Sequence, residues 1–175
     1  VHPLPAGDPE AIAPLLCGGV IGFRSLRVAG IGPDSGGQRI GFYGFGASAT
    51  IAIQVATHWG CEPYVVTRSA AEAQRARGLG AVWAGTYDQR VPVPLDAAVT
   101  FAPSGDVVVS ALKAVDRGAP VAINAIHLDR IPQLDYDDLW WERSLRSVAN
   151  VTRADVRDFL AVVPTAGVRT QYEVL

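Results

Sequence analysis

The stretch that decides the fold is Arg-Ile-Gly-Phe-Tyr-Gly-Phe-Gly-Ala-Ser-Ala at residues 39–49. The apolar run 39–44 predicts a buried strand, and residues 47–59 predict a helix that Gly60 ends. The turn between them is a GxGxxA run, formed by Gly44, Phe45, Gly46, Ala47, Ser48 and Ala49. Its first glycine permits a tight bend, its second lets the backbone approach a pyrophosphate, and the small Ala49 lets the helix pack on the strand. Any tight strand-to-helix turn favours glycine, but this context predicts nucleotide binding.

The alternation of strand and helix continues along the chain. The predicted strands cover residues 63–67, 81–84, 97–101, 120–125 and 147–150. Predicted helices begin at Ser69, where Glu72 completes a capping-box pattern, at about Ser104, and after Thr152. This alternation implies right-handed crossovers and a parallel sheet covered on both faces. The predicted fold class is therefore α/β, a doubly wound parallel sheet of the Rossmann dinucleotide-binding type.

A helical lead-in precedes this pattern. The sequence Asp8-Pro9-Glu10 predicts the start of a helix that continues with breaks to Arg27 or Val28. A Gly-rich loop at residues 30–37 follows it. We therefore expect a lead-in and loop over residues 1–38 and a dinucleotide-binding domain over residues 39–175. The chain holds no methionine, so we expect an excerpt of a longer protein or a chain that lost its initiator.

Composition excludes several classes of protein. Of the 175 residues, 49% are hydrophobic and 18% are charged, a balance that excludes disorder. The net charge of -2 offers no general attraction to nucleic acid or to an anionic membrane. No uninterrupted apolar run approaches the roughly 18 residues that span a bilayer. Two cysteines are too few for a disulfide framework, which predicts a reducing, cytoplasmic location.

The choice of cofactor is expected about 20 residues beyond the glycine motif, where an acid would bind the ribose hydroxyls of NAD. The chain has no acid there but Thr67, Arg68 and Ser69. A guanidinium beside two hydroxyls suits a 2′-phosphate, so the segment favours NADP over NAD. The alternative is that Arg68 is an ordinary solvated loop cation.

The remaining reactive residues carry weaker signals. Cys17 taken alone predicts a small buried hydrophobe, and Cys61 is expected to be structural. His127 follows a predicted strand, at the edge where ligands of such sheets gather, but a solvated loop histidine is an equal alternative. The chain has no nucleophile elbow, HExxH or GxxxxGK[ST] motif, so hydrolase, zincin and P-loop functions lack support. A SAM-binding fold also uses a Gly-rich first turn, but the small Ala49 counts against it.

Several segments together carry a resemblance. They are Ala-Pro-Leu-Leu-Cys-Gly-Gly at 13–19, Tyr-Gly-Phe-Gly-Ala-Ser-Ala at 43–49 and Ile-Gln-Val-Ala at 53–56. In these segments and their spacing the chain resembles the zinc-dependent alcohol dehydrogenases of the medium-chain dehydrogenase/reductase family. The resemblance extends over nearly the whole chain and implies its coenzyme-binding portion, with residues 1–38 belonging to the catalytic domain.

The resemblance implies further site residues. Residues after the later strands would line the dinucleotide, namely Phe101, Ala102, Asn124, Ala125, Ala149, Asn150 and Arg153. Cys17 would be the third ligand of a catalytic zinc, whose other ligands the family carries in a GroES-like domain that is absent here. Ile21 stands where many relatives have a threonine near the nicotinamide.

The implied activity is hydride transfer between an alcohol and an aldehyde or ketone, with NADP or NAD as cofactor and zinc in the full-length enzyme. The resemblance also implies a homo-oligomer formed through this domain. Two alternatives remain open: a non-catalytic dinucleotide-binding sensor or regulatory module, and a zinc-free enzyme fragment of the quinone reductase kind. The chain alone is expected to be inactive, because one cysteine cannot fix a catalytic zinc.

Overall fold

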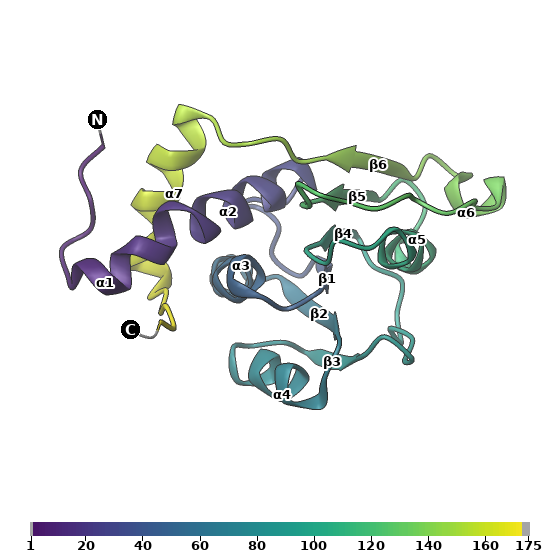
Figure 1. The fold of residues 1–175 in the computed structure, drawn as a ribbon, viewed down its shortest axis with the longest axis horizontal. Helices are drawn as coiled ribbons and strands as arrows, with labels where there is room; N and C mark the ends of the chain where they lie inside the picture. Colours follow the sequence, from purple (N-terminus) through teal and green to yellow (C-terminus); the bar gives the residue numbers. More distant parts are fainter. Residues whose placement is uncertain (1, 173–175) are drawn as a thin grey trace.

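The computed structural model describes residues 2–172 as a parallel sheet with helices on both faces (Figure 1). The sheet has six strands in the order β3-β2-β1-β4-β5-β6, and every neighbouring pair is parallel. The strands are β1 (Arg39–Tyr43), β2 (Glu62–Thr67), β3 (Trp83–Thr86), β4 (Ala97–Thr100), β5 (Pro120–Ile123) and β6 (Ser144–Ser147). This arrangement confirms the predicted doubly wound α/β fold.

The helices divide between the two faces of the sheet. They are α1 (Pro9–Ile12), the 3-10 helix η1 (Ala13–Leu16), α2 (Gly18–Val28), α3 (Ala47–His58), α4 (Ala70–Gly78), α5 (Gly105–Ala114), α6 (Tyr136–Leu139) and α7 (Arg153–Ala166). One apolar core joins α2, α3, α4 and α7 to one face, and a second core joins α5 to the other. Figure 1 shows α2, α3 and α7 on one side of the strands and α5 and α6 on the opposite side.

Two strands are displaced from their predicted positions. The strand β3 begins at Trp83 rather than residue 81, because Gly80 and Ala81 close the end of α4 through bonds to Arg77 and Ala76. The strand β6 covers Ser144–Ser147 rather than residues 147–150, because residues 144–147 pair with Pro120–Ile123 of β5. After Ser147 the chain leaves the sheet, and Asn150 adopts φ +50°. The short helix α6 was not predicted.

The two predicted helix starts at Ser69 and Thr152 are capped differently. At Thr152 a full capping box forms, since Thr152 and Asp155 each accept a bond from the other's backbone N–H. At Ser69 only half of the box forms: Ser69 Oγ accepts from Glu72 N at 3.2 Å, but the Glu72 carboxylate bonds Thr67 and Arg68. The second half of that prediction is therefore wrong.

The lead-in packs against α3 and α7 through a glycine face of α2. A Cβ at Gly22 would lie 2.8 Å from the backbone oxygen of Ser48, and a Cβ at Gly19 would lie 2.6 Å from the ring of Phe159. The helical stretch Pro9–Val28 is long and apolar enough to cross a membrane by length and composition, with mean hydropathy 1.4. Its α2 part instead supplies Val20, Phe23 and Leu26 to the core, and a core helix meets the same criterion.

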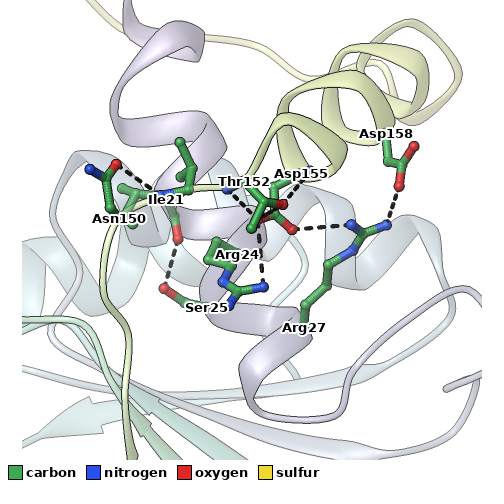
Figure 2. A network of polar contacts seen from close by, with 9 residues as sticks. Ile21, Arg24, Ser25, Arg27, Asn150, Thr152, Asp155 and Asp158 are labelled. Atoms are coloured by element: carbon green, nitrogen blue, oxygen red, sulfur yellow. Dashed lines mark hydrogen bonds and ion pairs between the residues drawn. The ribbon is translucent and has the colours of Figure 1, made fainter.

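A polar network fastens α2 to α7 on that face (Figure 2). The Asp155 carboxylate, 0% exposed as a residue, accepts from Arg27 Nη1 at 3.1 Å and lies 3.5 Å from Arg24 Nη1. Arg27 Nη2 donates to Asp158 Oδ2 at 2.6 Å. Burial alone would raise the pKa of Asp155, but bonds from Thr152 and Arg27 outweigh it and lower that pKa. Bonds from Arg157 and Arg27 lower the pKa of Asp158 to about 2.

Replacing Asp155 tests how much this network stabilises the fold. We expect Asp155→Ala to lower the free energy of unfolding by about 2–4 kcal/mol, since it removes a helix cap and leaves two guanidinium groups without their carboxylate. Urea denaturation at pH 7 measures the loss. The matched control, Asp106→Ala, removes an exposed first-turn acid from α5 and should cost less than about 1 kcal/mol.

The deficit of Asp155→Ala should depend on pH. A carboxyl group whose pKa is lowered by folding contributes stability above its unfolded pKa of about 4, and that contribution disappears as the pH falls through the folded pKa. The gap between wild type and Asp155→Ala should therefore narrow below about pH 4. A gap that is constant from pH 7 to pH 3 would mean that the ionised carboxylate is not the stabilising group.

Candidate cofactor-binding site

The glycine motif lies where the sheet changes winding direction, between β1 and β4. Gly44 adopts φ +95°, and a Cβ there would lie 2.9 Å from the backbone nitrogen of Ala102. The carbonyl oxygen of Tyr43 accepts from the backbone N–H groups of Phe101 and Ala102, at 2.7 and 3.2 Å. The turn after β1 is thereby held against the segment after β4. In open α/β sheets this crevice is where ligands bind.

The second glycine of the motif leaves open space in front of a helix N-terminus. Gly46 is the N-cap of α3, and a Cβ built on it would meet no atom within 4 Å. Gly46, Ala47 and Ser48 lie at least partly on the surface, whereas Phe45 and Ala49 are buried. The first amides of a helix have no intrahelical acceptor and carry the positive end of its dipole. The arrangement can therefore bind a phosphate group.

Thr67, Arg68 and Ser69 follow β2 at the same edge of the sheet, but they already have partners. Thr67 is 1% exposed and donates its hydroxyl hydrogen to Glu72 Oε2. The Arg68 side chain is 81% exposed and donates from Nε to Glu72 Oε1 at 2.9 Å. Ser69 caps α4. The sequence-based statement that no acid is present here needs correction, because α4 brings the Glu72 carboxylate to the end of β2.

Glu72 is ionised in this setting. Its partial burial opposes ionisation, but hydrogen bonds from Thr67 and Arg68 outweigh that cost and lower its pKa. Arg75, one turn further along α4, adds a favourable charge. Burial raises the pKa of Tyr87, and the charge of Glu72 adds to that rise while the charge of Arg68 opposes it.

Arg75 ties α4 to the glycine motif, a role that the sequence did not indicate. Its Nη2 donates to the carbonyl oxygen of Phe45 at 2.7 Å, and its guanidinium carbon lies 5.4 Å from the centre of the Phe45 ring. The two residues are thirty positions apart, and Arg75 has no distinctive local pattern. Only the fold brings them together.

A groove of about 480 Å³ opens beside this edge, on the α5 face. Tyr43 and Tyr87 line it together with residues of the following loop and of α5, including Val91, Asp106 and Val109. Tyr87 directly follows β3, whose last residue Thr86 pairs with Thr67 of β2, so the groove adjoins the end of β2. It offers aromatic and apolar surface next to the charged Thr67–Glu72 group.

The other predicted lining residues follow β5 and β6. Asn124 comes directly after β5, and its backbone N–H donates to Thr100 at 2.9 Å, so Asn124 and Ala125 lie at the same edge as Phe101. Ala149 and Asn150 follow β6, and Asn150 Oδ1 accepts from the backbone of Val151 (Figure 2). Arg153 is an exposed residue in the first turn of α7. These residues continue the edge across the second half of the sheet.

The two cysteines do not belong to a cluster of metal ligands in the part of the chain that the structure describes. Cys17 is exposed, contrary to the buried-hydrophobe alternative, and it precedes α2 next to α3, since a Cβ at Gly18 would lie 3.5 Å from Ser48 Oγ. Cys61 is buried, its thiol donates to the Ser35 carbonyl oxygen at 3.4 Å, and burial raises its pKa. Within residues 2–172, no three His, Cys, Asp or Glu side chains are grouped as metal ligands. These residues do not fit a zinc site, which needs at least three protein ligands.

Comparison with curated proteins finds alcohol dehydrogenases among the similar proteins. The chain is 51% identical over 160 residues to the probable alcohol dehydrogenase AdhA of Mycobacterium tuberculosis, matching 90% of this chain and 45% of that protein. It is 34% identical over 82 residues to the NADP-dependent alcohol dehydrogenase 6 of Saccharomyces cerevisiae, covering 46% of this chain and 22% of that protein. No protein-family model matches the chain.

Solved structures share the fold. A cinnamyl alcohol dehydrogenase of Sorghum bicolor superimposes with a TM-score of 0.81 at 18% identity, covering 99% of this chain and 51% of that structure's chain. The chain thus spans about half the length of both the Mycobacterium protein and the Sorghum enzyme. The chain is therefore similar in sequence to the probable alcohol dehydrogenase AdhA over about half of that protein's length, and it shares the fold of a second alcohol dehydrogenase.

Proposed function

We propose that this chain is the coenzyme-binding part of an alcohol dehydrogenase, which transfers hydride between an alcohol and NADP or NAD. The observation that carries the proposal is the open space at Gly46, in front of the N-terminus of α3 and at the crevice between β1 and β4. The 51% identity to a probable alcohol dehydrogenase supports the reaction class. In this proposal residues 39–175 bind the dinucleotide, and residues 1–38 link them to a catalytic domain.

Each part of the edge would have its own task. The amides of Gly46, Ala47 and Ser48 would hold the pyrophosphate, while the buried Phe45 and Ala49 fix the turn and the helix behind it. Thr67, Arg68 and Ser69 would surround the adenosine ribose, with the adenine ring entering the groove beside Tyr87. Phe101, Ala102, Asn124, Ala125, Ala149, Asn150 and Arg153 would line the nicotinamide half. The bound nicotinamide supplies the hydride chemistry, and the protein orients its ring.

We propose only one residue of this chain, Cys17, as a ligand of a catalytic zinc. Cys17 would supply one thiolate next to the dinucleotide, and the other ligands would have to come from outside residues 2–172. The substrate would be a small alcohol, aldehyde or ketone, and we propose a cytoplasmic location for an enzyme with free thiols. The outer strand β6, with the half-exposed Trp140 and Trp141 just before it, supports a homo-oligomer formed along this edge.

A valine at position 46 tests the site of the pyrophosphate. We expect Gly46→Val to abolish binding of NADPH and NADH while the chain stays folded, because the added side chain fills only the open space. Circular dichroism checks the fold and titration calorimetry checks binding. Gly32→Val, in a loop where a Cβ also meets nothing within 4 Å, is the control and should bind normally. A folded Gly46→Val variant that retains its affinity would place the cofactor elsewhere.

Replacing Arg68 tests the preference for NADP. The wild-type chain should bind NADPH more tightly than NADH, and Arg68→Ala should weaken NADPH binding about tenfold or more without a comparable effect on NADH. A charge-assisted hydrogen bond contributes about 1.5–3 kcal/mol, which corresponds to that factor. Titration of both cofactors, with Arg117→Ala as the control at an exposed position before β5, gives the comparison. Equal affinities that do not respond to Arg68→Ala would contradict the preference.

The chain by itself should bind a dinucleotide without oxidising alcohols or retaining zinc. One thiolate does not fix a metal in the geometry that catalysis needs. Metal analysis after dialysis and optical measurement of cofactor reduction with primary and secondary alcohols provide the two readouts. Stoichiometric zinc, or turnover that disappears in Cys17→Ser, would show that the chain is catalytically self-sufficient. Dinucleotide binding without turnover in the longer protein that contains this chain would favour the sensor alternative.

A further inference from the structure

Glu72 occupies the groups that the proposed function assigns to the adenosine ribose. Its two carboxylate oxygens accept from Thr67 Oγ1 and from Arg68 Nε. The backbone N–H of Glu72 donates to Ser69 Oγ, which fixes this residue in the first turn of α4. With only 16% of its side chain exposed, Glu72 is a fixed part of the site rather than a mobile surface acid.

These hydrogen bonds of Glu72 oppose the binding of a ribose 2′-phosphate more than that of a ribose 2′-hydroxyl. A threonine hydroxyl has one hydrogen, and Thr67 gives it to Glu72, so Thr67 cannot donate to a 2′-phosphate at the same time. The phosphate would also meet a like charge on Glu72 across the shared Arg68. A ribose 2′-hydroxyl has the opposite requirement, because it can donate to the carboxylate.

We infer that Glu72 is a specificity-determining residue that limits the preference for NADP, so that the site retains NAD. This inference rests on the proposed function, since it assumes that the adenosine ribose lies beside Thr67 and Arg68. Arg68 still attracts the phosphate, because within residues 2–172 its Nη hydrogens have no partner. Arg68 therefore favours the binding of a 2′-phosphate on the ribose, whereas Glu72 opposes it.

The substitution Glu72→Gln removes the negative charge of this side chain while keeping its length and its hydrogen bonds to its neighbours. Glutamine has the same length, and its amide can still bond both neighbours, so Arg68 and Ser69 keep their places. Its NH₂ group can also donate to the Thr67 oxygen, which releases the hydroxyl hydrogen for a phosphate. Removing one like charge in a half-buried setting should strengthen phosphate binding by about five- to tenfold.

Two half-molecules of the cofactors are the probes: adenosine 2′,5′-bisphosphate and adenosine 5′-monophosphate. Titration calorimetry at low salt would compare the wild-type chain with Glu72→Gln. The control is Glu62→Gln, which removes the same charge at the start of β2, at the opposite end of that strand. We expect Glu72→Gln to bind the bisphosphate about five- to tenfold more tightly and the monophosphate no more tightly, while Glu62→Gln matches the wild type.

The outcomes separate this inference from the proposed function. If Glu72→Gln binds the bisphosphate more weakly, Glu72 acts by positioning Arg68, and the inference is wrong. An unchanged ratio of the two affinities also overturns it, while normal binding of NADPH and NADH would leave the proposed function intact. If the folded wild-type chain binds neither the two half-molecules nor the whole cofactors, the proposed function fails as well.

Discussion

The buried carboxylate of Asp155 is the interaction on which the layer beside the glycine motif depends. Together with Thr152 it caps the N-terminus of α7, and it forms ion pairs with Arg24 and Arg27 of α2. A carboxylate taken out of water is costly unless its oxygens are all bonded, and here a backbone N–H, a hydroxyl and two cations share that task. Because α2 is fixed to α7, it can pack closely against α3 through Gly18 and Gly22.

That packing determines where α3 begins. Gly18 and Gly22 bring α2 close to Ser48, so the first turn of α3 lies against the lead-in. The turn before α3 is held by the Phe101–Ala102 segment through the carbonyl oxygen of Tyr43. The exposed amides at Gly46 are consequently held by a rigid surrounding rather than by the turn alone. Arg75 of α4 also fixes the glycine turn by donating a hydrogen bond to the carbonyl oxygen of Phe45. A binding site formed this way requires little rearrangement when an anion arrives.

The sequence predicted those parts of the structure that depend on local pattern. The GxGxxA turn, the helix start after Thr152 and most strand boundaries follow from residues within a few positions of one another. The contacts of Glu72 and Arg75 could not be predicted in this way, because their side-chain partners depend on how α4 lies against β2 and the glycine turn. The position of β6 was missed because its start is fixed by pairing with β5, not by its own weakly apolar residues. The roles of the residues lining the second half of the edge remain predictions.

The end of the described chain returns to its beginning. Thr170 donates to the carbonyl oxygen of Ala11, Tyr172 donates to Asp8, and Arg169 bonds Gln54 of α3 through its backbone. Forming contacts between residues about 160 positions apart in sequence carries a large entropic cost of loop closure. We therefore expect these contacts to form late in folding, after the strand-helix units of the sheet. The lead-in, which depends on α7 for its anchoring charges, would then dock as one of the last steps. Cys17 would thus reach its place beside α3 only once the dinucleotide-binding sheet is already complete.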